Sequence, residues 1–138
     1  MSDRVKKVSY TYLMIPNRAG KGAGVLAQLR QANVNLIGFS AFPGRGGKAQ
    51  VDLISDDLPG VRRVARRNRW RLSKVKKGFL IQGDDRVGAV SRHLDKLAGR
   101  KISVTAADAV TAGQGRYGMI LWVKQKDYAR AARALGAR

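Results

Sequence analysis

The sequence contains no cysteine and only one histidine, His93. The absence of cysteine excludes disulfides, thiolate nucleophiles and cysteine-ligated metal, and one histidine alone does not form a metal site. We therefore expect no cofactor, and we assign His93 a surface or semi-buried structural role on a helix. No constellation of catalytic side chains is apparent in the sequence. We therefore expect a protein without enzymatic activity.

Long hydrophobic runs are also absent. No window reaches the roughly 18 apolar residues that a membrane-spanning helix needs. The opening segment, MSDRVKKVSYTY, lacks the apolar core of a signal peptide. We therefore expect a cytoplasmic protein with no membrane contact.

Negative charge is scarce. All nine acidic residues are aspartates, against 28 lysines and arginines, so the formal net charge is +19. The excess is spread along the chain, with +11 in residues 1–74 and +8 in residues 75–138. Such a charge indicates either a solvated basic surface or contact with polyanions, and it carries no information about the fold.

The chain repeats itself at an offset of 68 residues. Asn17-Arg18-Ala19-Gly20 aligns with Asp85-Arg86-Val87-Gly88, and Val34-Asn35-Leu36 aligns with Ile102-Ser103-Val104. A constant offset indicates two copies of one supersecondary unit. We assign the first copy to residues 1–77 and the second to residues 78–138. A lobe of about 65–70 residues is only marginally stable alone, so we expect the two lobes to pack into one compact body.

Each copy alternates strand and helix patterns. Asn17 and Asp85 are predicted to cap the first helix of their copies, and Asn33 to end the first helix in a left-handed conformation. In the first copy we predict strands over 8–15, 36–42, 49–53 and 72–75, with a second helix opening at 56–59. In the second copy we predict strands over 79–82, 102–110 and 117–124 and helices over 86–98 and 127–135. The prediction is an α+β fold: a duplicated ferredoxin-like βαββαβ unit, with antiparallel sheets that carry helices on one face.

These motifs resemble those of the ACT domain family, whose small domains bind ligands and regulate amino-acid metabolism. The family has Asp or Asn followed by Arg-Pro-Gly, then a helix, then a Gly-Ile-Asn-Ile-like entry into the second strand. Here the proline is Ala19 or Val87, and the second glycine is Asn33 or Lys101. Lys101 is the poorest fit, because a residue with a Cβ resists the left-handed conformation. The whole chain is similar to free-standing proteins built of two such domains.

The resemblance implies a small effector, an amino acid, bound beside the turn before each first helix. A helix N-terminus suits a carboxylate, and a glycine there lets the ligand approach the backbone. In serine-responsive members, asparagines at the turn and at the start of the second strand hold the effector, and Asn17 and Asn35 match them. The family's accompanying histidine position falls on Ile15. The predicted ligand-binding residues are Asn17, Arg18, Ala19, Gly20, Asn35, Asp85, Arg86, Val87, Gly88 and Ser103.

Nucleic-acid binding is an alternative function for a protein with the same fold. Over Val61–Arg71 the apolar residues fall on one helical side and basic residues on the other. A row of arginines is a phosphate-binding surface in form, and we expect at most weak, non-specific polyanion contact from it. The arginines concerned are Arg62, Arg63, Arg66, Arg67 and Arg69.

The second copy ends after its last helix, so it has no fourth strand of its own. We consider two ways to fill that position: a bend in Trp70–Gly83, or the stretch Arg4–Val8 reaching across in the same chain or a partner. Because open sheet edges are normally covered, we predict a homodimer held partly by strand pairing, with the ligand turns near its interface.

Overall fold

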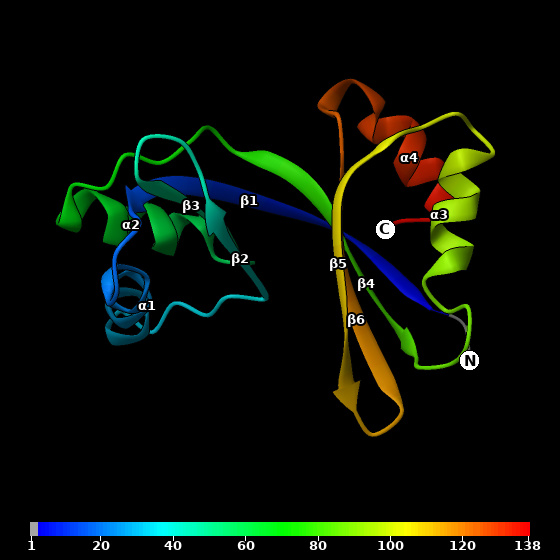
Figure 1. Cartoon of the computed structure of the whole chain (residues 1–138), viewed down its shortest axis with the longest axis horizontal. Coiled ribbons are helices and arrows are strands. Elements are labelled where there is room, and N and C mark those ends of the chain that lie inside the picture. Colours follow the sequence, from blue (N-terminus) through cyan, green and yellow to red (C-terminus); the bar gives the residue numbers. More distant parts are fainter. Residues whose placement is uncertain (1–2) are drawn as a thin grey trace. The chain divides into compact units, whose positions relative to one another are not determined.

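A computed structural model describes residues 3–138 of the chain (Figure 1). Strands and helices alternate along it as the repeat predicts. The strands are β1 (Arg4–Pro16), β2 (Gly38–Pro43), β3 (Lys48–Ile54), β4 (Lys76–Asp84), β5 (Val104–Gly113) and β6 (Arg116–Val123). The helices are α1 (Lys21–Gln31), α2 (Leu58–Asn68), α3 (Ser91–Ala98), the short 3₁₀ helix η1 (Gln125–Asp127) and α4 (Tyr128–Leu135). Within the described residues, no helix is both long and apolar enough to cross a membrane.

The first compact unit comprises Ser9–Lys76. Its strand order is β2–β3–β1, and both pairings are antiparallel. Successive side chains of a strand point to opposite faces, so Leu13 and its partner Val51 lie on one face of the sheet. Both helices pack their apolar sides into the same core. Its buried members are Leu13, Val25, Leu29, Val34, Val51, Leu53, Val61 and Val64.

The predicted strand over 72–75 is wrong, because this segment is irregular and β4 begins only at Lys76. The segment still lies along β1. The Ser73 N–H donates to the Tyr12 carbonyl at 2.8 Å, and the Tyr12 N–H donates to the Ser73 hydroxyl at 3.0 Å. The hydroxyl thus takes the place of a main-chain acceptor, which explains why regular strand pairing stops here.

The second compact unit combines the described residues up to Val8 with Lys77–Arg138. Its strand order is β5–β6–β4–β1, with α3 and α4 side by side (Figure 1). Phe79 of β4 stacks on Tyr128 of α4 with ring centroids 4.6 Å apart. Val5 is 7% exposed and belongs to the same core as Phe79, Ile81, Leu97, Met119, Leu121 and Leu135.

The beginning of β1 occupies the fourth strand position of this unit, which is one of the two solutions that the sequence allows. The strand lies next to β4, and Arg138 closes on its other side. The Arg138 N–H donates to Val5 O at 3.1 Å, and the Lys7 N–H donates to Arg138 O at 3.0 Å. The repeat counts residues up to 77 as one copy, whereas the contacts group the first strand residues with the second unit. The unfilled edge that motivated the predicted homodimer is therefore filled within the chain.

Both first helices begin later than the sequence predicts. α1 starts after Gly20 and α3 after Val90, and neither helix start has a side-chain cap. The predicted capping roles of Asn17 and Asp85 are therefore wrong. In each copy a turn with a left-handed glycine lies between the strand and the helix. The residues that we predicted for the first helical turn belong to this turn instead.

The ends of both first helices are equivalent in conformation. Asn33 has φ +58°, as predicted, and Lys101 has φ +57° despite its Cβ. The next residue in each copy, Val34 or Ile102, donates its N–H back into the helix, to Leu29 O or Leu97 O. Val34 and Ile102 are buried, so burial of the following apolar residue holds Lys101 in its unfavourable conformation.

We expect Lys101→Gly to raise the free energy of unfolding by about 1 kcal/mol. The left-handed conformation costs a residue with a Cβ roughly 1–2 kcal/mol, and the greater chain entropy of glycine offsets part of that gain. Urea unfolding measures the change. Lys101→Ala, which loses the same charge but keeps the Cβ, is the control and should show no gain. Equal stabilities of the glycine and alanine variants would contradict the argument.

Candidate functional site

Two turns form the repeated feature of the chain, Asn17–Gly20 before α1 and Asp85–Gly88 before α3. Gly20 has φ +87° and Gly88 φ +80°, a conformation that glycine adopts readily. The space where a Cβ would stand is open at both glycines. In both copies the turn is tied to the neighbouring hairpin by one bond of 2.8 Å: the Asn17 N–H donates to Gly47 O, and the Asp85 N–H donates to Gly115 O.

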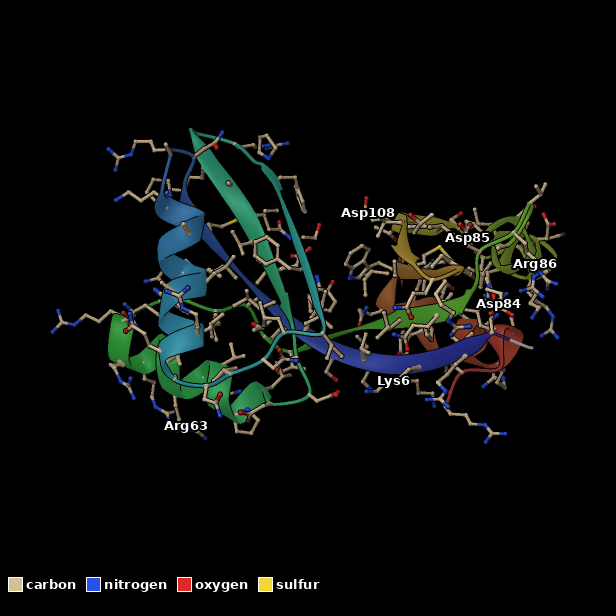
Figure 2. All side chains as sticks on the ribbon, turned by 90° about the horizontal axis from the view of Figure 1, so that it is seen from below. Lys6, Arg63, Asp84, Asp85, Arg86 and Asp108 are labelled. Atoms are coloured by element: carbon tan, nitrogen blue, oxygen red, sulfur yellow. The ribbon has the colours of Figure 1, made fainter. Side chains whose placement is uncertain are left out.

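All eight residues of the two turns are exposed, and Figure 2 shows Asp85 and Arg86 at the surface. Among the described residues, the side chains of Asn17 and Asp85 have no hydrogen-bond partner. Each helix also begins with N–H groups that have no backbone partner in the described chain, those of Gly22 and Ala23 in α1 and of Val90 and Ser91 in α3. Free N–H groups and the positive end of a helix dipole favour an anionic group.

Asn35 does not lie beside the first turn. Asn17 precedes α1 and Asn35 follows it, and a helix of 11 residues spans about 16 Å at 1.5 Å per residue. Asp85 and Ser103 likewise lie before and after α3, whose 8 residues span about 12 Å, and Ser103 is exposed. One amino acid therefore does not reach both predicted positions within one unit.

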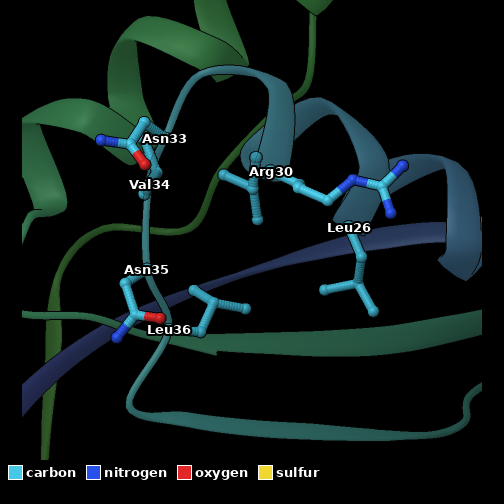
Figure 3. Close-up of a pocket in the computed structure, with 7 residues that line it drawn as sticks. Leu26, Arg30, Asn33, Val34, Asn35 and Leu36 are labelled. Carbon is cyan, nitrogen blue, oxygen red and sulfur yellow. The ribbon is translucent and has the colours of Figure 1, made fainter.

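Asn35 instead lines a groove of about 360 Å³ at the far end of α1 (Figure 3). Leu26 and Arg30 project from the helix, while Asn35 and Leu36 project from the segment that leads to β2. The Asn35 carbonyl accepts a hydrogen bond from the Ser55 hydroxyl at 2.7 Å, which fixes the backbone of this segment. The lining of the groove combines apolar and polar side chains: Leu26, Leu29, Arg30, Asn33, Val34, Asn35 and Leu36.

The sequence interpretation missed Arg30 and the groove around it. The available signal was the pair Asn33 and Asn35 on either side of the apolar Val34, because alternation places both amides on the side away from the core. Val34 is buried and both asparagines are exposed.

The arginines of α2 lie on the exposed side of the helix, as predicted. Val61, Val64 and Ala65 are buried, whereas Arg62, Arg63, Arg66, Arg67 and Arg69 are exposed. Figure 2 shows Arg63 extending away from the ribbon. The helix ends at Asn68, so Arg69, with φ +57°, is at its C-terminal cap and not on its face.

A buried polar cluster in the second unit joins residues far apart in sequence. Asp3 Oδ2 accepts hydrogen bonds from Tyr117 Oη at 2.6 Å and from Arg92 at 2.8 Å, and it lies 2.7 Å from His93 Nε2. The His93 and Asp3 side chains are 3% and 4% exposed. The predicted surface or semi-buried place of His93 is therefore wrong. A Cβ at Gly83 would collide with the carboxylate, so the cluster needs glycine there.

The cluster holds the Asp3 carboxylate in its charged form. Burial alone would raise the pKa of Asp3, but the hydrogen bonds from Tyr117 and His93 and the charge of Arg92 outweigh it, so the pKa lies below its usual value. Burial and the neighbouring Asp3 together raise the pKa of Tyr117 far above its usual value, so the phenol remains a donor.

Comparisons with known proteins identify the fold. No family model and no curated sequence matches the chain. A solved structure of protein BT0572 from Bacteroides thetaiotaomicron shares 15% identity over 97% of this chain and 88% of its own, with a TM-score of 0.76. The regulatory subunit of aspartate kinase from Thermus thermophilus shares 12% identity over 99% of this chain and 95% of its own, with a TM-score of 0.64. The corresponding subunit from Thermus flavus shares 14% over 98% and 94%, with a TM-score of 0.61.

Likeness at these identities establishes the architecture. The predicted α+β fold, with its duplicated βαββαβ unit, is confirmed, and so is the resemblance to tandem ACT regulatory domains over nearly the whole chain. The chain thus has the fold of regulatory subunits.

We expect Asp3→Asn to destabilise the protein at neutral pH by about 1.5–3 kcal/mol, the usual range for hydrogen bonds to a charged group. Because the folded pKa is depressed, this contribution is complete above the unfolded pKa of about 3.9 and is lost as pH falls through the folded pKa. Thermal unfolding of parent and variant from pH 7 to pH 3 should show the difference closing on acidification. Asp108→Asn, an exposed change on β5, is the control, and a difference that is independent of pH would contradict this account.

Proposed function

We propose that this chain is a non-catalytic, cytoplasmic regulatory protein that binds a small effector, an amino acid, at the turns before α1 and α3. The fold is similar to that of aspartate kinase regulatory subunits. The observation that carries the proposal is the first turn itself, where an open left-handed Gly20, an uncommitted Asn17 amide and free helix N–H groups stand together.

The chemistry of this turn suits a zwitterion. The N–H groups of Gly22 and Ala23 are donors for a carboxylate, and the missing side chain of Gly20 leaves room for close approach. The Asn17 side-chain oxygen is an acceptor for an ammonium group. The second turn offers Asp85 in the same place, whose carboxylate is a stronger partner for an ammonium group.

A second copy of the chain gives Asn35 a part in the site. Because α1 separates Asn17 from Asn35 in one unit, both asparagines contact one effector only when two chains place a turn against the Asn35 segment. We propose a homodimer on this ground. β5 is the edge of its sheet and is almost entirely exposed, so it offers an unpaired edge for strand pairing between chains.

Regulation follows from such an arrangement. An effector that binds the assembled form more tightly than the separate chains shifts the population toward that form. The size of the shift is limited by the difference between the effector's affinities for the assembled form and for the separate chains. A site that only two chains complete makes this difference large.

We expect Asn17→Ala and Asn35→Ala each to weaken binding of the effector about tenfold or more, since a hydrogen bond to a charged group contributes about 1.5–3 kcal/mol. A thermal-shift screen of the twenty amino acids finds the effector, and calorimetry measures the affinities. Gln31→Ala, exposed near the end of α1, is the control.

Sedimentation in the presence of the effector should show a species of about twice the 15.1 kDa chain mass. Unchanged affinity in both asparagine variants would place the site elsewhere. Loss of effector affinity in Asn17→Ala alone, together with a monomeric protein, would support binding at the turn and exclude a site shared by two chains.

The exposed arginines of α2 favour a second candidate function, weak contact with nucleic acids. We expect binding to duplex DNA at low salt only, with log K falling against log salt by about 0.9 for each phosphate contact. The double variant Arg63→Gln with Arg67→Gln should lose about two phosphate contacts. A fluorescence titration should therefore show a shallower slope of log K against log salt, by about 0.9 for each lost contact. Sub-micromolar binding to one sequence at physiological salt would reverse the order of the two functions.

A further inference from the structure

The first unit contains a small pocket that shares no residue with the turns before α1 and α3 or with the groove beside Asn35. It is formed by β1, the beginning of α2 and the irregular segment that precedes β4, and its volume is about 170 Å³. A dry apolar cavity of about 150 Å³ holds one benzene molecule, so this pocket has room for a ligand of about six to eight non-hydrogen atoms. Its lining consists of Thr11, Leu58, Arg62, Leu72, Ser73 and Val75.

The two hydroxyl groups of the lining are already hydrogen-bonded within the protein. The pocket lies where regular strand pairing beside β1 stops. There the Thr11 hydroxyl donates to Ser73 O at 2.8 Å, and the Ser73 hydroxyl donates to Lys74 O at 2.9 Å. Each hydroxyl has one proton to donate, so neither has a donor left for a ligand. The other uncharged residues of the lining are aliphatic: Leu58, Leu72 and Val75.

Arg62 is the one charged residue of the lining, and no carboxylate contributes to it. Arg62 is exposed on α2, and its guanidinium makes no ion pair or hydrogen bond within the part of the chain that the structure describes. All of its side-chain N–H groups are therefore available to a ligand. The pocket thus combines aliphatic walls with a single unpaired cation.

We propose that this pocket binds a short aliphatic carboxylic acid without an amino group, such as 3-methylbutanoate. The Arg62 guanidinium donates two parallel hydrogen bonds to the carboxylate, a geometry that suits both groups. The aliphatic tail leaves water for the apolar walls. An ammonium group would meet no carboxylate in this lining and would be repelled by Arg62. The ligand therefore differs from the zwitterion proposed for the turns, and the two sites are independent.

Titration with 3-methylbutanoate at physiological salt, followed by the methyl NMR signals of Leu58, Leu72 and Val75, tests the proposal. We expect these signals to shift and to saturate. Two other ligands are matched controls. Valine has the same carbon chain and carboxylate with an added ammonium group, and 3-methylbutanamide has the same chain without the charge. Both should bind in this pocket at least about tenfold more weakly, because the first is repelled and the second does not pair with Arg62.

A pair of variants separates Arg62 from the general positive charge of α2. Arg62→Gln should weaken binding of 3-methylbutanoate at least about tenfold. The control Arg66→Gln removes the same charge from an exposed position on α2 that does not line the pocket, and it should keep the parent affinity within about twofold. Both side chains are exposed, so both variants should fold, and urea unfolding without ligand checks this.

Three results would each overturn the proposal: no saturable shift of the methyl signals in the parent, equal affinities for the acid and the amide, or equal weakening in the two variants. The amide signals of Gly20 and Gly88 report on the turns in the same spectra. Failure of this site and failure of the proposed effector site are therefore observed separately.

Discussion

The structure depends on one strand that takes part in both compact units. β1 is 13 residues long, and its first residues complete the second unit while the rest pairs with β3 in the first. Val5 belongs to one core and Leu13 to the other. Without the first part of β1, β4 would be an open edge and Val5 would leave its place beside Phe79 and Ile81. The second unit is therefore closed by residues that precede it by some 70 positions, and contacts between residues so distant in sequence slow folding because loop closure comes first.

The Asp3 cluster fixes where this strand begins. A buried carboxylate is costly unless it is paired and hydrogen-bonded, and here Arg92, His93 and Tyr117 all contact Asp3 Oδ2. Asp3, Arg4 and Lys6 line a cavity of about 830 Å³ to which Gln82 of β4 also contributes. Strand placement, burial of Asp3 and the convergence of cations are consequences of one arrangement, so they are coupled in energy.

The sequence predicted the repeated unit, its fold class and the left-handed Asn33, because these depend on local patterns that recur at a constant offset. Asn17 shows the limit of such patterns. An asparagine before a helix is a good cap in isolation, yet the left-handed Gly20 moves the start of α1 beyond its reach. His93 shows another limit: its partner Asp3 lies 90 residues away in sequence, and no periodicity links them. The resemblance in sequence assigns Asn17 and Asn35 to one ligand site. It gives no distances, and in the structure the 11 residues of α1 separate the two asparagines.

The excess of positive charge has two different physical meanings in the two parts of the chain. On α2 the arginines stand in solvent, where water and salt screen them and each contributes little to any one contact. In the second unit Arg4, Lys6, Arg116 and Arg138 converge on one cavity, where Arg116 is paired with Asp84 at 2.7 Å. Convergence, more than net charge, separates a site from a solvated surface. The turns before α1 and α3 add a third, weaker kind of positive potential, that of helix N–H groups, whose reach is limited to about one helical turn and suits one carboxylate.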